Sequence, residues 1–349
     1  MHTGPILALD LGKYKSVACV YPPGGGSPTF DTVPASREAL LALLQLRRPA
    51  VVVIEACASA GWVHDLCVQH GLRCKVANTA TEAWRFKHLK RKTDKDDALR
   101  LAQLEALGQL PTVSVPPPAV REKRSLILAR QRLVGLRVRA QNRLRALLVA
   151  QGLDAPRGAA AWSAAGLAVF EQHARPLADC SPEERWRGLI HLALVEYRQL
   201  LAWEQQTEAK LDALGKADAQ VARLRTVPGV GPRTAEVVAA YLHEPGRFRS
   251  GKEVGAYAGL VPRQHQSGEC DRRGRITRRG PGVLRKLLVE CAWVMLRYNR
   301  WAAAVYARLS RGKARMKQAI VAVARRLLVR CWAMLRDGTN WREELATSG

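Results

Sequence analysis

Four carboxylates near the N-terminus have the residue types and spacing of a metal site for phosphoryl chemistry. Asp10 interrupts the apolar run ILALDLGK, Glu55 follows the run VVVI, and Asp94 and Asp97 are three apart on one face of an expected helix. Taken singly, they are more simply turn residues, helix caps or solvated side chains. Together, strand ends and a helix face can bring them to one point, where their repulsion favours a bound cation. Mg²⁺ prefers such oxygen ligands, with Mn²⁺ as its substitute, so the set predicts a magnesium site.

The segment DLGK followed by a hairpin has a second interpretation. The same arrangement forms the phosphate-binding start of actin-like sugar kinases and chaperone ATPases. Such a fold needs a further phosphate loop downstream, and we recognise none in the sequence. The kinase interpretation is therefore the main competitor for this region, but it is disfavoured.

The segment LRTVPGVGPRTA predicts two helices joined by a tight turn, with the second helix beginning near Pro232. Gly229 and Gly231 permit the positive φ and the close approach that such a turn needs. Backbone amides at the start of the second helix could then face a DNA phosphate. This is the helix-hairpin-helix pattern of sequence-independent DNA contact, and a packing turn without nucleic acid is the alternative.

A basic, glycine-punctuated segment follows, with eight Lys or Arg residues between positions 263 and 286 opposed by Glu269 and Asp271. We expect a loop that fits a phosphate backbone and leaves the Ser267 hydroxyl accessible. A serine in a polar loop is usually a turn residue. His265 lies two residues away, but the chain has no GxSxG elbow, so an ester hydrolase is not favoured.

The elements expected to position the acidic set alternate between strands and helices. Residues 5–20 predict a strand, a tight turn and a returning strand, and residues 51–54 predict a buried strand. Helices are expected over 35–46, 61–70 and 93–107, with an extended segment over 72–77. This alternation predicts an α/β layer domain of about 110 residues.

The proline-rich segment 110–120 predicts the domain boundary, because Pro116, Pro117 and Pro118 cannot continue a helix. Amphipathic helices are expected over 121–153 and 182–214, and the two could pair as an antiparallel coiled coil. The rest of the chain reads as mostly helical. We therefore expect three domains, over residues 1–115, 116–216 and 217–349.

The composition indicates a polyanionic partner. The 349 residues include 56 Lys and Arg against 30 Asp and Glu, a net charge of +26. Nucleic acid is the commonest large polyanion that such a protein meets. Residues 300–336 alone hold ten basic residues and no acid. If all ten contacted phosphates, the logarithm of the binding constant would fall with a slope of about −9 against the logarithm of the salt concentration.

Other classes are disfavoured by the same composition. The sequence has no apolar run long enough to span a membrane and no secretory signal pattern, so we expect a cytoplasmic protein with no membrane partner. The eight cysteines form no CxxC pair and read as reduced thiols, and the eight histidines show no zinc-site spacing. A transition-metal enzyme is not expected.

These motifs, in this order, resemble the DEDD insertion-sequence transposases of the IS-one-ten class, including its IS-eleven-eleven branch. The resemblance covers nearly the whole chain and rests on the segments ILALDLGK, VVVIEA, KTDKDDA, VPGVGPRTA, AYAGLVPR, QSG and RRGRITRRGPGVLRKLL. It implies an RNase H-like domain of the RuvC type, a coiled-coil insertion, and a mainly helical C-terminal transposase domain with the helix-hairpin-helix element.

The resemblance also implies an activity. By motif match, Asp10, Glu55, Asp94 and Asp97 would hold Mg²⁺, and Ser267 would attack DNA to form a phosphoserine linkage. Members of the family are recombinases guided by a noncoding bridge or seeker RNA that pairs with donor and target DNA. Their active sites combine the acidic set of one subunit with the serine of another, which implies a dimer or tetramer. Candidates for phosphate contact are Arg263, Arg272, Arg273 and Arg275.

Two departures and two alternatives stay open. Asp96 stands where the family usually has a hydrophobic residue, and residues 155–180 match nothing recognisable. The first alternative is a metal-dependent endonuclease of the Holliday-junction type, in which Ser267 is only structural. The second is a noncatalytic nucleic-acid-binding relic. The protein would be bacterial, and associated with the nucleoid when bound to DNA.

Overall fold

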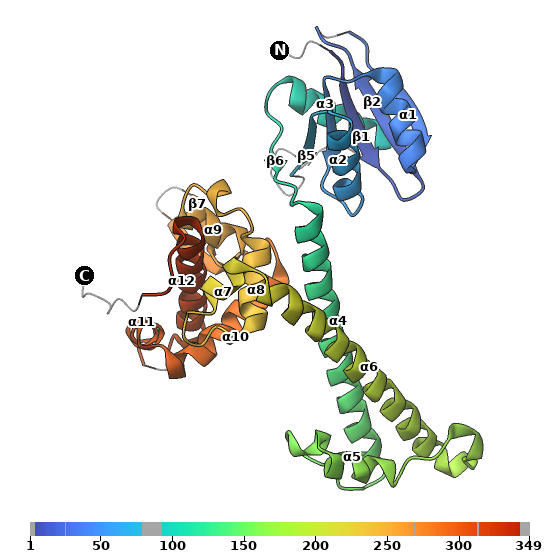
Figure 1. Cartoon of the computed structure of the whole chain (residues 1–349), viewed down its shortest axis with the longest axis vertical. Helices are drawn as coiled ribbons and strands as arrows, with labels where there is room; N and C mark the ends of the chain where they lie inside the picture. Colours follow the sequence, from blue (N-terminus) through green and yellow to red (C-terminus); the bar gives the residue numbers. More distant parts are fainter. Residues whose placement is uncertain (1–3, 25, 79–92, 268–269, 313, 343–349) are drawn as a thin grey trace. The chain divides into compact units, whose positions relative to one another are not determined.

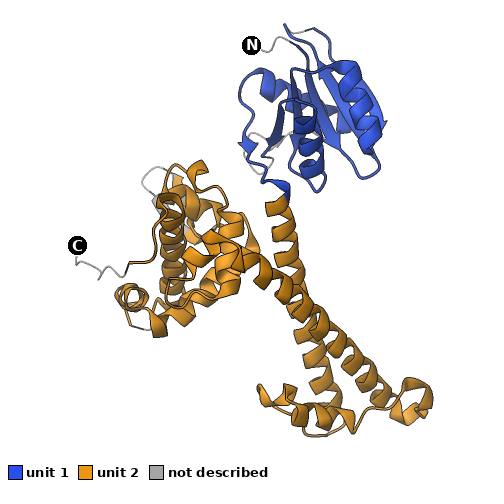
Figure 2. Cartoon of the chain, viewed as in Figure 1, with its two compact units in different colours: residues 1–118 blue, residues 119–349 orange. Residues whose placement is uncertain are grey.

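A computed structural model describes residues 4–24, 26–78, 93–267, 270–312 and 314–342. The chain divides into two compact units, Met1–Pro118 and Ala119–Gly349 (Figure 2). The first unit is built around a sheet, and the second is mainly helical (Figure 1). The expected combination of an α/β N-terminal region with a helical remainder is confirmed.

The first unit contains a six-stranded sheet with the order β3-β2-β1-β4-β5-β6. The first three strands form an antiparallel meander, β4 and β5 run parallel to β1, and β6 is antiparallel to β5. The strands span Ile6–Leu11, Lys15–Tyr21, Thr29–Pro34, Val51–Glu55, Cys74–Ala77 and Thr112–Val113.

Helices cover both faces of this sheet. Four consecutive residues of β1 and of β4 are buried, so both faces of these strands are apolar and both must be covered. Leu7, Leu9 and Ile54 pack with residues of α1 (Arg37–Arg47) and α2 (Ala60–Gln69). Residues of the opposite parity, such as Ala8 and Val53, pack against α3 (Asp94–Ala106). The predicted strands and helices of this region are therefore confirmed to within a few residues.

The second unit begins with two long helices, α4 (Pro118–Val149) and α6 (Arg185–Lys216), which pair antiparallel. Their shared core includes Leu144 and Leu194. Ion pairs of 2.6 Å join Arg137 to Glu204 and Arg143 to Glu196 across the pair. Between them lie α5 (Ala164–Glu171) and three short 3-10 helices, at Ala160–Trp162, Leu177–Asp179 and Pro182–Glu184.

The rest of the second unit packs around one apolar core that includes Leu224, Val238, Leu288 and Leu327. Its helices are α7 (Ala219–Leu224), α8 (Pro232–Tyr241), α9 (Gly251–Tyr257), α10 (Gly282–Tyr298), α11 (Arg300–Ser310) and α12 (Met316–Asp337), with a 3-10 turn at Pro245–Arg247. A two-stranded hairpin, β7 (Pro262–Ser267) and β8 (Cys270–Ile276), lies between α9 and α10.

One strand was not predicted, and one expectation about local structure was wrong. Thr29–Pro34 forms the additional strand β3, whose sequence TFDTVP lacks the regular apolar alternation that predicts a strand. The basic segment expected to be a loop forms β7 and β8 instead. Its strands are polar and charged, so the hydrophobic alternation that predicts a strand is missing. The hairpin forms because the backbone groups of the two strands pair with each other, from Pro262 opposite Ile276 to Ser267 opposite Cys270.

None of the helices within the described ranges combines the length and apolar character that crossing a bilayer requires.

Candidate active site

Asp10 and Glu55 lie at the same edge of the sheet of the first unit. In the parallel pairing of β1 and β4, Leu9 stands opposite Ile54, and the two acids are the next residue of each strand. Both are partly buried. Because side chains alternate along a strand, Asp10 shares a face with Ala8 and Glu55 shares a face with Val53. The two carboxylates are therefore neighbours on the face that α3 covers.

The direction of α3 brings the other two acids to this edge. At its C-terminal end, Glu105 accepts a 2.6 Å hydrogen bond from Lys75, near the start of β5, so the helix ends at the amino edge of the parallel strands. Its first turn consequently lies toward the carboxyl edge. Ala98 and Leu101 are buried against the sheet, and each lies one helical turn after one of the two acids. Asp94 and Asp97 are therefore on the side of α3 that faces the sheet.

Asp96 has a separate structural role. Thr93 is the N-cap of α3, and its backbone N–H and its hydroxyl donate to the Asp96 carboxylate at 3.0 and 2.7 Å. In return, the Asp96 amide donates to Thr93 Oγ1 at 3.3 Å. This capping box fixes the start of the helix. The Asp96 carboxylate is thus explained by helix capping.

The four acids lie along one edge of the sheet and do not surround a common point as the ligands of a bound metal would. Within the described ranges no group of three or more His, Cys, Asp or Glu side chains stands ready to hold a metal. Asp10, Glu55 and Asp97 each take part in further interactions. Their donor atoms are all carboxylate oxygens, which suit a hard divalent cation. The chemistry of the donor set fits Mg²⁺, and ligand geometry would require these side chains to rearrange.

The candidate nucleophile lies in the second unit. Ser267 is the last residue of β7 and pairs with Cys270 across the hairpin, so the strands are joined through positions 268–269, which lie outside the described residues. Arg263 on β7 and Arg272 and Arg275 on β8 are exposed to solvent. The side chains of Ser267 and Arg273 lie outside the described part of the structure. The hairpin thus carries cationic side chains along both strands.

The turn between α7 and α8 has the expected boundaries, since α8 begins at Pro232. Gly229 adopts a positive φ of 91° and packs closely against Met295 of α10. Gly231 is the exposed N-cap of α8, and a Cβ added there would have no heavy atom of the described residues within 4 Å. One glycine is therefore needed for packing, and the other leaves the start of α8 accessible.

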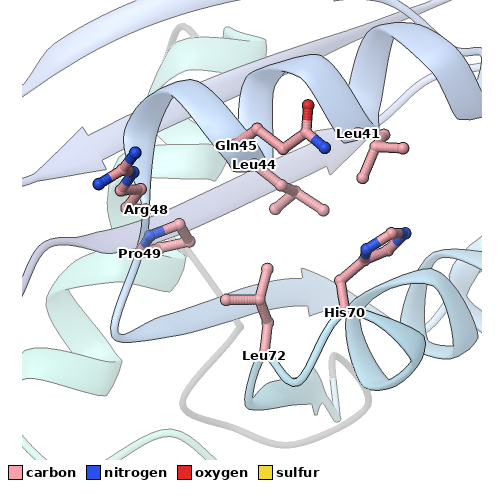
Figure 3. Close-up of a pocket in the computed structure, with 7 residues that line it drawn as sticks. All are labelled: Leu41, Leu44, Gln45, Arg48, Pro49, His70 and Leu72. Carbon is pink, nitrogen blue, oxygen red and sulfur yellow. The ribbon is translucent and has the colours of Figure 1, made fainter.

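Two hollows formed by described residues of the first unit lie away from the acidic edge. A groove of about 490 Å³ is lined by Leu41, Leu44, Arg48, His70 and Leu72, where α1 and α2 end (Figure 3). Another, of about 780 Å³, includes Lys75 and Glu105. Both adjoin the amino edge of the parallel strands.

Sequence reasoning passed over Tyr14 and Lys15, which close the turn between β1 and β2 at the acidic edge. Tyr14 is 78% exposed. The available signal was an aromatic residue between two lysines, directly after the strand that carries Asp10.

Comparison with known proteins identifies the family of the chain. Residues 7–151 match a model described as a transposase of the DEDD type, and residues 221–307 match the model of the transposase IS116/IS110/IS902 family. The chain is 31% identical to the "Probable family 20 transposase" of Pseudomonas aeruginosa, covering 84% of this chain and 86% of that protein.

Two further relatives extend the comparison. The "Transposase for insertion sequence element IS1111A" of Coxiella burnetii is 28% identical, over 97% of this chain and 91% of its own length. The "Pilin gene-inverting protein" of Moraxella lacunata is 33% identical over 33% of this chain and 36% of its own length. Because both units are matched and the Pseudomonas aeruginosa relative aligns over 84% of this chain, the chain belongs to the IS116/IS110/IS902 family of insertion-sequence transposases.

Proposed function

We propose that this transposase cuts and rejoins DNA through a phosphoserine linkage to Ser267, with the acidic edge of the first unit holding Mg²⁺. Membership of the family implies DNA substrates and their cutting and rejoining. The observation that carries the metal part is the placement of Asp10 and Glu55 on adjacent strand ends, with the first turn of α3 at the same edge. The serine part rests on the motif and on its cationic hairpin.

The sheet topology supports an RNase H-like domain of the RuvC type. An antiparallel meander of three strands continues into two parallel strands, with helices on both faces, and the carboxylates stand on the central strand and its parallel neighbour. In open α/β sheets, ligands bind beyond the carboxyl ends of the parallel strands. The proposed metal site is on that side.

In the proposed reaction, the Ser267 oxygen forms a bond to a DNA phosphorus as the bond from phosphorus to a deoxyribose oxygen breaks. The serine gives up its proton, and the departing DNA end takes one to become a hydroxyl. A hydroxyl on another DNA end then attacks the phosphoserine and restores the serine. The bond energy is conserved, so no nucleotide triphosphate is consumed.

A serine hydroxyl is a weak nucleophile near neutral pH, so charge stabilisation must drive this step. Mg²⁺ bound at the acidic edge would neutralise charge on the phosphate and its oxygens. Arg263, Arg272 and Arg275 are exposed cations of the hairpin that could stabilise the same charge. Asp10, Glu55, Asp94 and Asp97 would orient the phosphate through the bound ion.

We further propose three features of the complex from the family resemblance. The turn at Gly229 and Gly231 contacts the DNA backbone, supported by the accessible start of α8. A noncoding guide RNA pairs with donor and target DNA, consistent with a net charge of +26. The acidic edge and the serine act across subunits of a dimer or tetramer. A relative that matches a third of this chain is named a pilin gene-inverting protein, and a DNA rearrangement is in keeping with the proposed activity.

The decisive experiment is to incubate the full chain with Mg²⁺, RNA transcribed from the DNA flanking its gene, and labelled donor and target duplexes. The expected result is an SDS-resistant protein–DNA adduct that mass spectrometry maps to Ser267. Ser267→Ala and Asp10→Ala should each abolish the adduct. Ser181→Ala is the matched control, because that serine is exposed and makes no capping hydrogen bond. Omission of the RNA tests guidance separately.

The endonuclease alternative predicts a different outcome from the same experiment. Cleaved ends without an adduct, lost in Asp10→Ala but retained in Ser267→Ala, would mean that the acidic edge activates water and that the serine is structural. Stable DNA binding with no cleavage under any of these conditions would leave the noncatalytic interpretation.

A further inference from the structure

The turn between β1 and β2 presents an aromatic ring to solvent at the acidic edge. Tyr14 is 78% exposed, the highest value among the large apolar side chains of the described ranges. A single exposed apolar residue needs no explanation in general. This one calls for an explanation because of its rigidity, its charged neighbours and its position.

The turn is held in place on both sides. Leu11 pairs with Ser16 across the two strands, so the ladder continues up to the turn. A side chain at Gly12 would lie 2.3 Å from the Lys15 carbonyl oxygen, which shows how tightly the backbone closes there. The Tyr14 carbonyl accepts a 3.0 Å hydrogen bond from the Ala35 amide, next to the cap of α1. The exposure of the ring is therefore fixed by the fold.

Two lysines give this ring a cationic setting. Lys13 Nζ lies 4.9 Å from the centroid of the Tyr14 ring, a cation–π contact that occupies one face of the ring. Lys15 is exposed on the other side of Tyr14 in the sequence. The contact with Lys13 leaves the second ring face available for stacking. A flat partner with negative charge beside it would satisfy both the ring and the lysines.

The position of the turn ties it to the acidic edge. Asp10 and the turn belong to the same strand end, and a strand advances about 3.3 Å per residue. Gly12 therefore lies on the order of 7 Å beyond Asp10, and bases along one strand of a duplex are spaced about 3.4 Å apart. The ring is thus within a few nucleotides of a phosphate held by the acidic edge.

We propose that Tyr14 is a stacking platform for an unpaired DNA base close to the phosphate that is cut, with Lys13 and Lys15 binding the neighbouring phosphates. Aromatic rings combined with lysines are how proteins hold single strands without reading sequence. A paired base has both faces covered within the duplex, so the partner must be unpaired. DNA that is cut and rejoined between two duplexes has to pass through such a state. The part that concerns the cut phosphate rests on the proposed function of the acidic edge.

Binding by the full-length protein tests the platform. The probes are a fully paired DNA duplex and the same duplex with a short unpaired stretch containing the fluorescent base 2-aminopurine. Tyr14→Ala should weaken binding of the unpaired probe by about 5- to 150-fold, the range for losing one stacked base, and should abolish the quenching of 2-aminopurine. Binding of the paired duplex should change by less than about twofold. Tyr14→Phe keeps the ring and should bind as the wild type does.

The matched control is Tyr298→Ala, because Tyr298 is 66% exposed and belongs to the other unit. It should leave binding of both probes unchanged. Equal effects of Tyr14→Ala and Tyr298→Ala, or an equal loss for paired and unpaired DNA, would overturn the platform. A loss seen with single-stranded RNA but not with DNA of the same sequence would overturn its assignment to DNA.

The lysines and the position of the base are tested separately. Lys13→Gln and Lys15→Gln should each reduce the salt slope of binding by about one. A 5-iodouracil base should crosslink to Tyr14 only when it lies within a few nucleotides of the cut phosphate, and a crosslink confined to distant bases contradicts the placement. Asp10→Ala and Ser267→Ala should retain Tyr14-dependent binding. Cleavage that survives both of those variants refutes the proposed function while leaving the platform intact.

Discussion

At the scale of single residues, the buried glutamates differ in whether their carboxylate oxygens are paired with a basic side chain. Glu105 and Glu204 each meet a basic side chain at 2.6 Å. Glu236 on α8 is almost fully buried and lies 3.3 Å from Arg233, but its Oε2 atom has no hydrogen-bond partner among the described atoms. A buried acid with an unsatisfied oxygen is costly to ionise.

Glu236 therefore predicts a pH dependence of stability. Burial raises the pKa of its carboxyl above the ordinary value, although Arg233 opposes the shift. The native state then holds this proton more tightly than the unfolded state, so the free energy of unfolding falls as pH rises from the ordinary pKa through the raised one. Glu236→Gln should flatten that decline in chemical denaturation across pH 4 to 8. Glu183→Gln, at an exposed position, should leave it unchanged.

The cysteines predict a pattern of chemical labelling. Burial raises the pKa of both Cys19 and Cys291 to about 11, so few of these thiols are ionised at pH 8. Cys57 and Cys180 are partly exposed free thiols. In the native protein, iodoacetamide should modify Cys57 and Cys180 at least tenfold faster, as measured by peptide mass spectrometry. Comparable rates at all four sites would contradict the burial of Cys19 and Cys291.

At the scale of elements, the turn between α7 and α8 depends on α10. Gly229 lies against Met295, and its carbonyl accepts from the Cys291 thiol at 3.4 Å. The Asn299 side chain donates to the Pro228 carbonyl at 3.5 Å and also caps α11. The turn is thus part of the core of the second unit, whatever it binds.

The two glycines of this turn should respond differently to alanine. Gly229→Ala requires a positive φ of an L-residue and brings its Cβ within 2.8 Å of Met295 Cγ, so we expect a loss of about 1–3 kcal/mol. Gly231→Ala enters open space at a φ of −80° and should cost less than about 1 kcal/mol. Denaturant unfolding distinguishes the two, and equal losses would contradict this packing.

The pairing of α4 with α6 also predicts a contrast between two ion pairs. Glu204 is buried and bonded to Arg137, so Glu204→Ala leaves a poorly solvated guanidinium and should cost about 3–5 kcal/mol. The ion pair of Glu196 with Arg143 is far more exposed, and Glu196→Ala should cost less than about 1 kcal/mol. Thermal unfolding of the two variants measures the difference, and similar melting temperatures would be inconsistent with a buried pair.

At the scale of the whole molecule, the excess of basic residues is partly used for structure. Arg330 lies over the rings of both Trp301 and Trp341, with distances of 4.8 and 4.3 Å to the ring centroids. Arg336 pairs with Asp337 and lies over another tryptophan ring. Of the ten basic residues in 300–336, at most eight are therefore available to a phosphate backbone.

Binding to duplex DNA should consequently be steep in salt, but less steep than ten contacts would make it. If the face of α11 and α12 supplies the contacts, the slope of log K against log [NaCl] should be about −7. Fluorescence anisotropy between 50 and 300 mM NaCl measures it. A slope shallower than about −3 would show that most of these cations do not touch DNA.

The sequence by itself determined the local order of the molecule, because apolar periodicity and caps act over a few residues. Strand alternation identified β1 and β2, and a continuous β-branched run identified β4. The apolar spacing identified α4 and α6, and Pro232 marked the start of α8. The same reasoning missed β7 and β8, since polar strands carry no hydrophobic alternation. The division into domains at residues 115 and 216, and the roles of the site residues, remain predictions.

Only the tertiary structure decided which side chains share an edge and which are committed elsewhere. The spacing of KTDKDDA puts Asp94 and Asp97 on one helix face but does not assign a role to Asp96. In the structure, Asp96 forms the capping box with Thr93, and α3 runs so that its first turn lies at the carboxyl edge of the parallel strands. Likewise, only the closure of the β1–β2 turn against Ala35 presents Tyr14 at that edge. These outcomes depend on contacts between residues distant in sequence, and such contacts form only when the chain packs.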